Sequence, residues 1–238
     1  MIVTIVFAYV IFGMVGFGTA LIASPVLLFF LPLSSIIPLL ALLDMFAAIS
    51  NVTKDGKKAD YSELKALIPL MFIGSFIGFL VLMKVDPIHA LLAFGVFTLL
   101  YAIYSLSGFK PHKNFNKKYV IPFGLGGGFL GAMFGSGGFL YAIYLDGRIE
   151  TPEKIRVTQT TLIGCSTLVR VILFSIAGVY FSSNILALAI IFIPSMLIGT
   201  FVGKRITLKL SKPQFMKIIN IVILLSAISI IIKYFLAT

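Results

Sequence analysis

The sequence carries little charge. Only 11% of its 238 residues are Asp, Glu, Lys or Arg, whereas soluble globular proteins average about 25%. Polar side chains are therefore too few to cover a water-facing surface. This shortage excludes an ordinary soluble enzyme, a disordered chain and a DNA-binding domain, so no nucleic-acid partner is expected. Tryptophan is absent, and the single cysteine, Cys165, excludes an intrachain disulfide.

The sequence is rich in long apolar runs. Hydrophobic residues make up 60% of the chain, and the mean hydropathy is +1.12. A helical membrane span needs about 20 mostly apolar residues. Eight apolar segments are present, at 2–31, 35–53, 64–83, 88–107, 119–145, 157–181, 185–203 and 215–237. We therefore predict an all-α polytopic membrane protein. No cleavable signal peptide is expected, because the first run continues past Leu31 and has no charged segment before it.

Two of these segments are interrupted by glycine. Segment 2–31 contains Gly13, Gly16 and Gly18, and segment 119–145 contains eight glycines between 124 and 138. Each glycine inside a helix costs about 1 kcal/mol, which makes a continuous helix doubtful. We predict that both segments are broken or re-entrant helices, which are tolerated at membrane depth where they are buried in protein. Close packing of unbroken helices is the alternative.

The positions of the basic residues favour the re-entrant arrangement. The net charge is +11, from 19 Lys and Arg against 8 Asp and Glu. Eight full crossings would divide the basic loops almost equally between the two sides. If the two glycine-rich segments turn back, residues 54–65, 108–118, 146–156 and 204–217 share one side, together with all but three of the basic residues. The positive-inside rule then predicts a cell-membrane protein with cytoplasmic basic loops and non-cytoplasmic termini.

The chain also contains an internal repeat. Residues 69–78 read PLMFIGSFIG and residues 194–203 read PSMLIGTFVG, and the glycine clusters occur in the same order. We predict a first transmembrane repeat at 1–108, a basic cytoplasmic linker at 109–118 and a second repeat at 119–238. Each repeat would hold one broken helix and three crossings, so the second copy would be inverted relative to the first. Inverted repeats with broken helices are typical of secondary transporters. The GxxxG spacing predicts tight helix packing.

These motifs resemble those of the sulfite exporter TauE/SafE family. The resemblance rests on GFGTALIASP at 16–25, on GSGGF at 135–139 and on the duplicated PxMxIGxFxG element. The sequence departs from symmetry after the second hairpin, where Tyr144 replaces the proline and Asp146, Arg148 and Glu150 follow. The resemblance implies export of sulfite, sulfonates and related small organosulfur anions.

Two ionisable residues lie in the middle of predicted spans and are the main candidates for the site. Such residues are costly in a membrane and mark functional sites. Asp44 is near the centre of 35–53 and Arg170 near the centre of 157–181, which are corresponding segments of the repeat. Arg170 would bind an anionic substrate through its planar guanidinium. Asp44 would be its resting counter-ion or a proton carrier, and a pair that only fixes packing remains an alternative.

Polar groups near these two residues complete the predicted site. Helical spacing places Gln159 and Ser166 on the face of Arg170, and Asn51 lies in the segment of Asp44. Backbone N–H groups at the start of a half-helix attract anions. The tips of the two hairpins therefore add Gly18, Thr19, Ser24, Ser136, Gly137 and Gly138 as candidates.

The sequence thus predicts a secondary transporter of small organosulfur anions that works by alternating access. No catalytic motif, cofactor or metal site is expected. A transporter of another solute, such as a cation or metal ion, is the first alternative. An integral-membrane enzyme or assembly factor is the second. Proton coupling through Asp44 and a homodimer both stay open.

Overall fold

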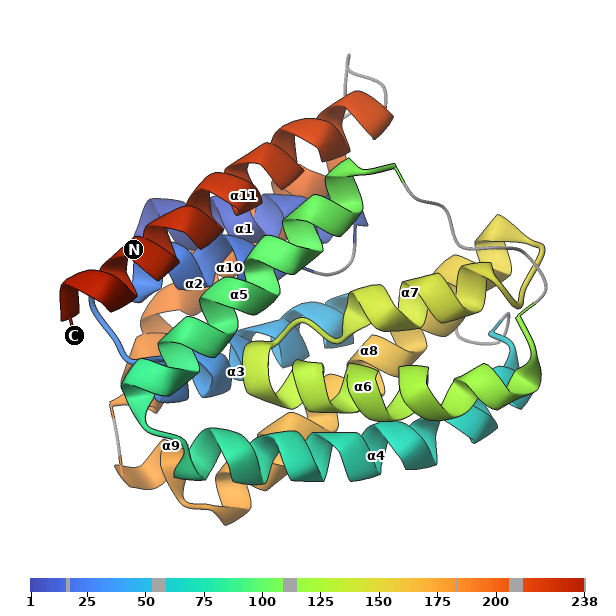
Figure 1. Ribbon diagram of the computed structural model, residues 1–238, viewed down its shortest axis with the longest axis horizontal. Helices are drawn as coiled ribbons and strands as arrows, with labels where there is room; N and C mark the ends of the chain where they lie inside the picture. Colours follow the sequence, from blue (N-terminus) through green and yellow to red (C-terminus); the bar gives the residue numbers. More distant parts are fainter. Residues whose placement is uncertain (16–17, 53–58, 109–114, 183, 206–211, 238) are drawn as a thin grey trace.

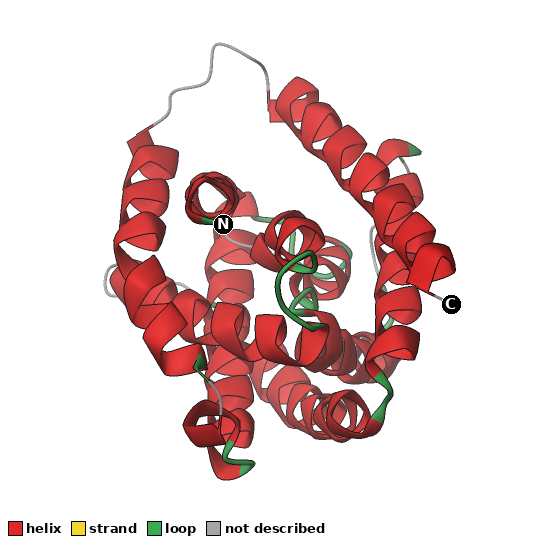
Figure 2. Ribbon diagram, turned by 90° about the vertical axis from the view of Figure 1, so that its left-hand side faces the viewer, coloured by secondary structure: helices red, strands yellow, loops and turns green. Residues whose placement is uncertain are grey.

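The computed structural model describes residues 1–15, 18–52, 59–108, 115–182, 184–205 and 212–237. Every regular element in these residues is a helix (Figure 2), which confirms the predicted all-α class. The first half comprises α1 (Ile2–Val15), α2 (Thr19–Leu27), α3 (Leu33–Val52), α4 (Tyr61–Lys84) and α5 (Pro87–Leu106). The second half comprises the 3-10 helix η2 (Lys117–Tyr119), α6 (Val120–Phe134), α7 (Gly138–Asp146), α8 (Pro152–Ile176), α9 (Val179–Ser182), α10 (Ile185–Arg205) and α11 (Lys212–Ala237).

Both glycine-rich segments are broken, as predicted. The first is divided into α1 and α2, and α2 begins just after Gly18, whose φ is 95°. The second is divided into α6 and α7 at a turn that begins with Gly135, whose φ is 66°. Only glycine adopts such angles without strain. Gly18 therefore lies just before the second arm of the first hairpin, and Gly135 lies just after the first arm of the second hairpin. In Figure 1, α7 runs back along α6 as the second arm of a hairpin.

The glycines from 124 to 131 are not part of the break, although in the sequence each of them counts equally against a continuous helix. They lie inside the continuous helix α6, where they let other groups approach closely. A methyl group at Gly128 would collide with the carbonyl of Met71, and one at Gly127 would collide with the Tyr141 ring. The packing gained on two sides offsets the low helix propensity of glycine.

The two GxxxG pairs make equivalent contacts in the two halves, which confirms the predicted tight packing. Gly74 and Gly78 of α4 lie against the carbonyls of Leu125 and Phe129 in α6. Their counterparts in α10 have the same environment, because Gly199 and Gly203 lie against the carbonyls of Val6 and Val10 in α1. In each half, therefore, the helix that carries the GxxxG pair packs closely against the first hairpin arm of the other half.

The other helix pairs follow the same exchange. Helix α5 packs on α11, and α3 packs on α8, so these pairs also join the two halves of the chain. Helices α5 and α11 lie side by side and run in opposite directions (Figure 1). The two halves therefore pack against each other along several pairs of helices and are not separate units joined end to end.

The outer surface is apolar where a membrane would surround it. In the described residues, four helices are long and apolar enough to cross a membrane, namely Tyr61–Lys84, Pro87–Leu106, Glu153–Ile176 and Ile185–Gly203. Large apolar side chains point outwards from α4 and from α10 at matching positions, such as Phe72, Phe76, Leu197 and Phe201. Exposed apolar surface of this extent is unfavourable in water and is expected for a lipid-facing helix. The glycine faces of the same helices point inwards.

Candidate functional site

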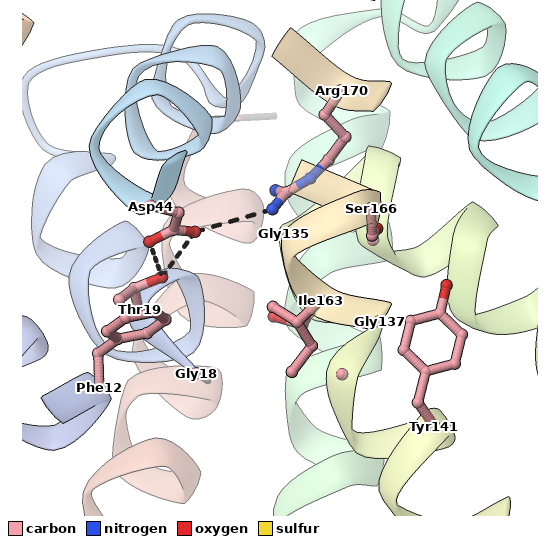
Figure 3. A pocket seen from close by; sticks show the side chains of 13 residues that line it. Phe12, Gly18, Thr19, Asp44, Gly135, Gly137, Tyr141, Ile163, Ser166 and Arg170 are labelled. Atoms are coloured by element: carbon pink, nitrogen blue, oxygen red, sulfur yellow. Dashed lines mark hydrogen bonds and ion pairs between the residues drawn. The ribbon is translucent and has the colours of Figure 1, made fainter. Parts of the chain in front are cut away.

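A small polar cavity lies where the two hairpin turns meet the centres of α3 and α8. It leaves about 20 Å³ for the centres of water-sized molecules, enough for one or two waters. The N-termini of α2 and α7 both reach it, through Gly18 and Thr19 on one side and through Gly137 and Gly138 on the other. Asp44 and Arg170 face each other across it (Figure 3).

Asp44 is held mainly by the first hairpin. Its side chain lies in the middle of α3, and only 5% of the residue is exposed. The Tyr9 hydroxyl of α1 donates to Oδ1 at 2.8 Å. The Thr19 hydroxyl, at the start of α2, lies 3.0 Å from Oδ1 and 3.2 Å from Oδ2. Two hydroxyl donors therefore replace part of the hydration that this carboxylate loses on burial.

Arg170 makes few of the bonds that its guanidinium can make. It is 4% exposed, and its Nη2 donates to Thr167 Oγ1, one turn earlier in α8, at 3.0 Å. The same nitrogen lies 3.8 Å from Asp44 Oδ2, which is an ion-pair contact without a hydrogen bond. Neither Nε nor Nη1 has a hydrogen-bond partner in the described part of the chain. Because buried donors are nearly always paired, these two nitrogens, with three N–H groups between them, indicate a place for a ligand.

The turn of the second hairpin presses against this guanidinium. A methyl group at Gly135 would meet Ala20 and would lie 3.5 Å from Arg170 Nη1. A methyl group at Gly137 would collide with the carbonyl of Gly127 in α6. Both glycines are therefore required by close approach, and Gly135 is also required by its positive φ. Gln159 of α8 holds the tip of this hairpin, because its side-chain amide donates a hydrogen bond to the Gly138 carbonyl at 3.3 Å.

An apolar wall closes the rest of the cavity. Phe12 of α1, Tyr141 of α7 and Ile163 of α8 line it, and the Tyr141 hydroxyl end lies next to Ser166 (Figure 3). The cavity thus joins one cationic group, one anionic group and several small polar groups to an apolar surface. This is the composition of a site for a small charged solute.

Most of the residues predicted from the sequence meet here. Eight of them line the cavity: Gly18, Thr19, Asp44, Ser136, Gly137, Gly138, Ser166 and Arg170. Gln159 contacts the tip of the hairpin instead. Ser24 is buried inside α2, away from the cavity lining, and its hydroxyl has no partner among the described residues. Asn51 falls in the last turn of α3, and its side chain lies outside the described residues.

The sequence reasoning missed Tyr9 and Tyr141. Both are fully buried tyrosines in apolar hairpin arms, where they read as packing groups. Spacing offers a weak signal for Tyr9, because it lies one turn before Gly13 on the inward face of α1 and Gly13 packs against Gly203. The sequence gives no reason to single out Glu63 either. It lies at the start of α4, and its side chain is buried in an ion pair with Arg148.

Two broken helices whose second arms, α2 and α7, begin at a buried charge pair are an arrangement typical of helical membrane transporters. The comparison with known families agrees with this class. The chain belongs to the sulfite exporter TauE/SafE family, whose model matches residues 1–230 of the 238. This is a family of membrane transporters. No curated protein and no solved structure matches the chain.

Proposed function

We propose that this protein is a secondary transporter that exports small organosulfur oxyanions, such as sulfite and short sulfonates, by alternating access. The observation that carries the proposal is the Arg170 guanidinium, which is buried at the cavity with Nε and Nη1 left without partners. A guanidinium with donors left over on two of its nitrogens can donate hydrogen bonds to the oxygens of an oxyanion.

The hairpin tips add to the attraction for an anion. The first N–H groups of α2 and of α7 have no partner within their helices, and both helix dipoles have their positive ends at the cavity. The hydroxyl of Ser166 lies at the same place. An oxyanion between the two tips would therefore meet donors from both halves of the chain.

The size of the cavity supports a cycle with an occluded state. Room for one or two waters is too little for a sulfonate, so the walls must separate to admit it. We infer that the two halves are inverted repeats that rock against each other. The exchanged contacts of the GxxxG helices and the opposite directions of α5 and α11 (Figure 1) support this arrangement.

The direction of transport follows from the membrane potential. An inside-negative potential drives an anion outwards with about 2.3 kcal/mol per charge per 100 mV. Basic loops on the cytoplasmic side would also concentrate anions at the entrance. Export down the electrical gradient therefore needs no ATP.

Transport in proteoliposomes tests the proposal. We expect uptake of labelled sulfite and of a short alkylsulfonate by the purified wild-type protein and uptake at the level of empty vesicles for Arg170→Ala. Lys84→Ala is the matched control, because Lys84 is also basic and outside the basic loops but is exposed at the end of α4. Unaltered transport by Arg170→Ala would remove the proposed role of Arg170. Uptake of a labelled cation instead of any sulfur anion would favour the alternative of cation transport.

The orientation is a second part of the proposal. We place the basic loops in the cytoplasm of a cell that holds the protein in its plasma or inner membrane, with both termini outside. Single cysteines introduced into residues 108–118 and 182–184 of a Cys165→Ala protein test this by labelling with an impermeant thiol reagent. We expect the two positions to be labelled from opposite sides. Labelling from the same side contradicts the predicted number of crossings.

A further inference from the structure

The buried pair Asp44–Arg170 is unequal in its two members. Asp44 accepts hydrogen bonds from Tyr9 and Thr19, which belong to α1 and α2 of the first hairpin. Neither bond depends on Arg170. If the arginine moves away by a small distance, the carboxylate keeps both hydroxyl donors.

Arg170 belongs to the other half and is tied to Asp44 only loosely. The contact of 3.8 Å between Nη2 and Oδ2 is electrostatic, and the one hydrogen bond that Nη2 makes goes to Thr167 of its own helix. No other charged side chain of the described residues lines the cavity. Asp44 alone therefore balances the charge of Arg170, but it leaves hydrogen-bond donors of the guanidinium unused.

This balance matters most when the site is empty. An isolated charge in a low-dielectric interior is strongly unfavourable, and removing one partner of a buried pair leaves that cost in place. With Asp44 opposite Arg170, the empty site has no net charge from these two groups. With an oxyanion on Arg170 and Asp44 retained by its hydroxyls, the site carries the charge of the oxyanion.

We propose that Asp44 is a resident counter-anion, which occupies Arg170 in the empty transporter and yields it to the transported oxyanion while Tyr9 and Thr19 hold the carboxylate. This inference rests on the proposed function and adds the mechanism of coupling. Asp44 sets the affinity for the substrate by competing for the guanidinium. The empty transporter returns neutral, and the loaded transporter moves the charge of the anion without a proton.

The proposal separates two modes of transport in an Asp44→Asn variant. Anion exchange requires only the loaded site, in which the anion itself balances Arg170. Net uptake also requires the empty site to return, and in the variant this step would bury Arg170 without a counter-ion. We expect the KM for exchange of labelled for unlabelled sulfite to fall by about threefold or more, because the competing carboxylate is gone, and net uptake to fall by about tenfold or more.

The experiment measures both modes in proteoliposomes, with Asp86→Asn as the matched control because Asp86 is an exposed acid at the start of α5. Wild-type net uptake should accelerate when the vesicle interior is made positive. With a short alkylsulfonate, which stays fully ionised near neutral pH, an internal pH indicator should record no proton uptake with the anion. Equal loss of exchange and of net uptake in Asp44→Asn overturns the proposal. Proton uptake in proportion to anion uptake by the wild type also overturns it.

A second variant keeps the test decisive if Asp44→Asn does not fold. Thr19→Val removes one hydroxyl donor from Asp44, so the carboxylate should rely more on Arg170 and compete more strongly with the substrate. We expect the KM for exchange to rise about threefold or more, and an unchanged or lower KM contradicts the proposal. Failure of the wild type to move any sulfur oxyanion is a separate result, which defeats the proposed function before either variant is compared.

Discussion

In the described residues, two ion pairs join the halves of this protein, one buried and one partly buried, and they differ in how completely their hydrogen bonds are made. In each, the acid comes from the first half and the arginine from the second. Glu63 and Arg148 lie at the end of the molecule where α4 begins and α7 ends. Asp44 and Arg170 lie in the middle, at the cavity.

The Glu63–Arg148 pair is saturated. Arg148 donates from Nε and Nη2 to Glu63 Oε1 at 3.0 and 2.8 Å, and from Nη1 to the carbonyl of Phe115 at 3.0 Å. The Tyr144 hydroxyl donates to Glu63 Oε2 at 2.7 Å. The hydrogen bonds that Arg148 makes to Glu63 raise the pKa of Arg148 above its usual value.

In the Asp44–Arg170 pair, by contrast, most hydrogen-bond donors of the arginine have no partner in the described residues. Of the three guanidinium nitrogens of Arg170, only Nη2 has a hydrogen-bond partner in the described residues. A polar cluster whose bonds are all made fixes a structure, whereas a partly satisfied one is costly unless something else completes it. The comparison therefore assigns the first pair to holding the hairpin α6–α7 against α4 and the residues around Phe115. It leaves the second pair for a ligand.

The largest expected effect is on stability, from breaking the saturated pair. Glu63→Ala leaves the partly buried Arg148 and the Tyr144 hydroxyl without their common partner, at a cost of about 3 kcal/mol. We expect a clear fall in the melting temperature of the purified protein in detergent. Glu150→Ala, which changes an exposed acid close by, is the control. Equal melting temperatures for Glu63→Ala and wild type would break the comparison.

The next largest effect is expected from a substitution that keeps the positive charge of Arg148 but removes its planar guanidinium. A lysine in place of Arg148 cannot donate to Glu63 and Phe115 together in the same planar geometry. Arg148→Lys should therefore lose about 1–2 kcal/mol of stability, with the KM for anion exchange unchanged. Thermal denaturation and exchange assays on the same preparation measure both quantities. A large change in KM would place Arg148 in the transport site and contradict the assignment.

The two pairs also differ in whether they can be predicted from the sequence. Asp44 and Arg170 are predictable because a charge in the middle of an apolar run has few explanations. Glu63 and Arg148 are at the ends of such runs, where charged residues are normal. Burial is decided there by the third dimension, since Arg148 meets Phe115 and Glu63 across long sequence separations.

The fold follows the same rule. Long apolar segments and the glycine breaks are local properties, and the structure has both. The sequence could not distinguish glycines that turn the chain from glycines that pack. Gly135 turns because its φ is positive, while Gly128 packs because Met71 of α4 lies against it. This difference depends on a neighbouring helix more than 50 residues away in the sequence.

A third prediction tests the unsaturated pair with the same substitution as the saturated one. Arg170→Lys should change stability by less than about 1 kcal/mol, because the arginine makes a single hydrogen bond, to Thr167. The KM for sulfite exchange should rise about tenfold, which corresponds to about 1.4 kcal/mol. The two lysine variants are thus expected to show opposite patterns of stability and KM. If Arg170→Lys destabilises the protein as much as Arg148→Lys, both pairs are structural.

The smallest expected effects come from removing one hydroxyl at each acid. Tyr144→Phe leaves Glu63 with both bonds from Arg148, and Tyr9→Phe leaves Asp44 with Thr19 and the loose contact to Arg170. Each should lose about 1 kcal/mol of stability, so melting curves alone will not separate them.

Exchange kinetics will separate these two variants, because the hydroxyls have different consequences for the arginine. Loss of the Tyr9 hydroxyl makes Asp44 depend more on Arg170, which should raise the KM for sulfite by about threefold at unchanged maximal exchange rate. Loss of the Tyr144 hydroxyl acts on a pair that no substrate enters, so KM should stay as in the wild type. A KM that moves equally in both variants would mean that the two pairs are coupled, and that the saturated pair also moves during transport.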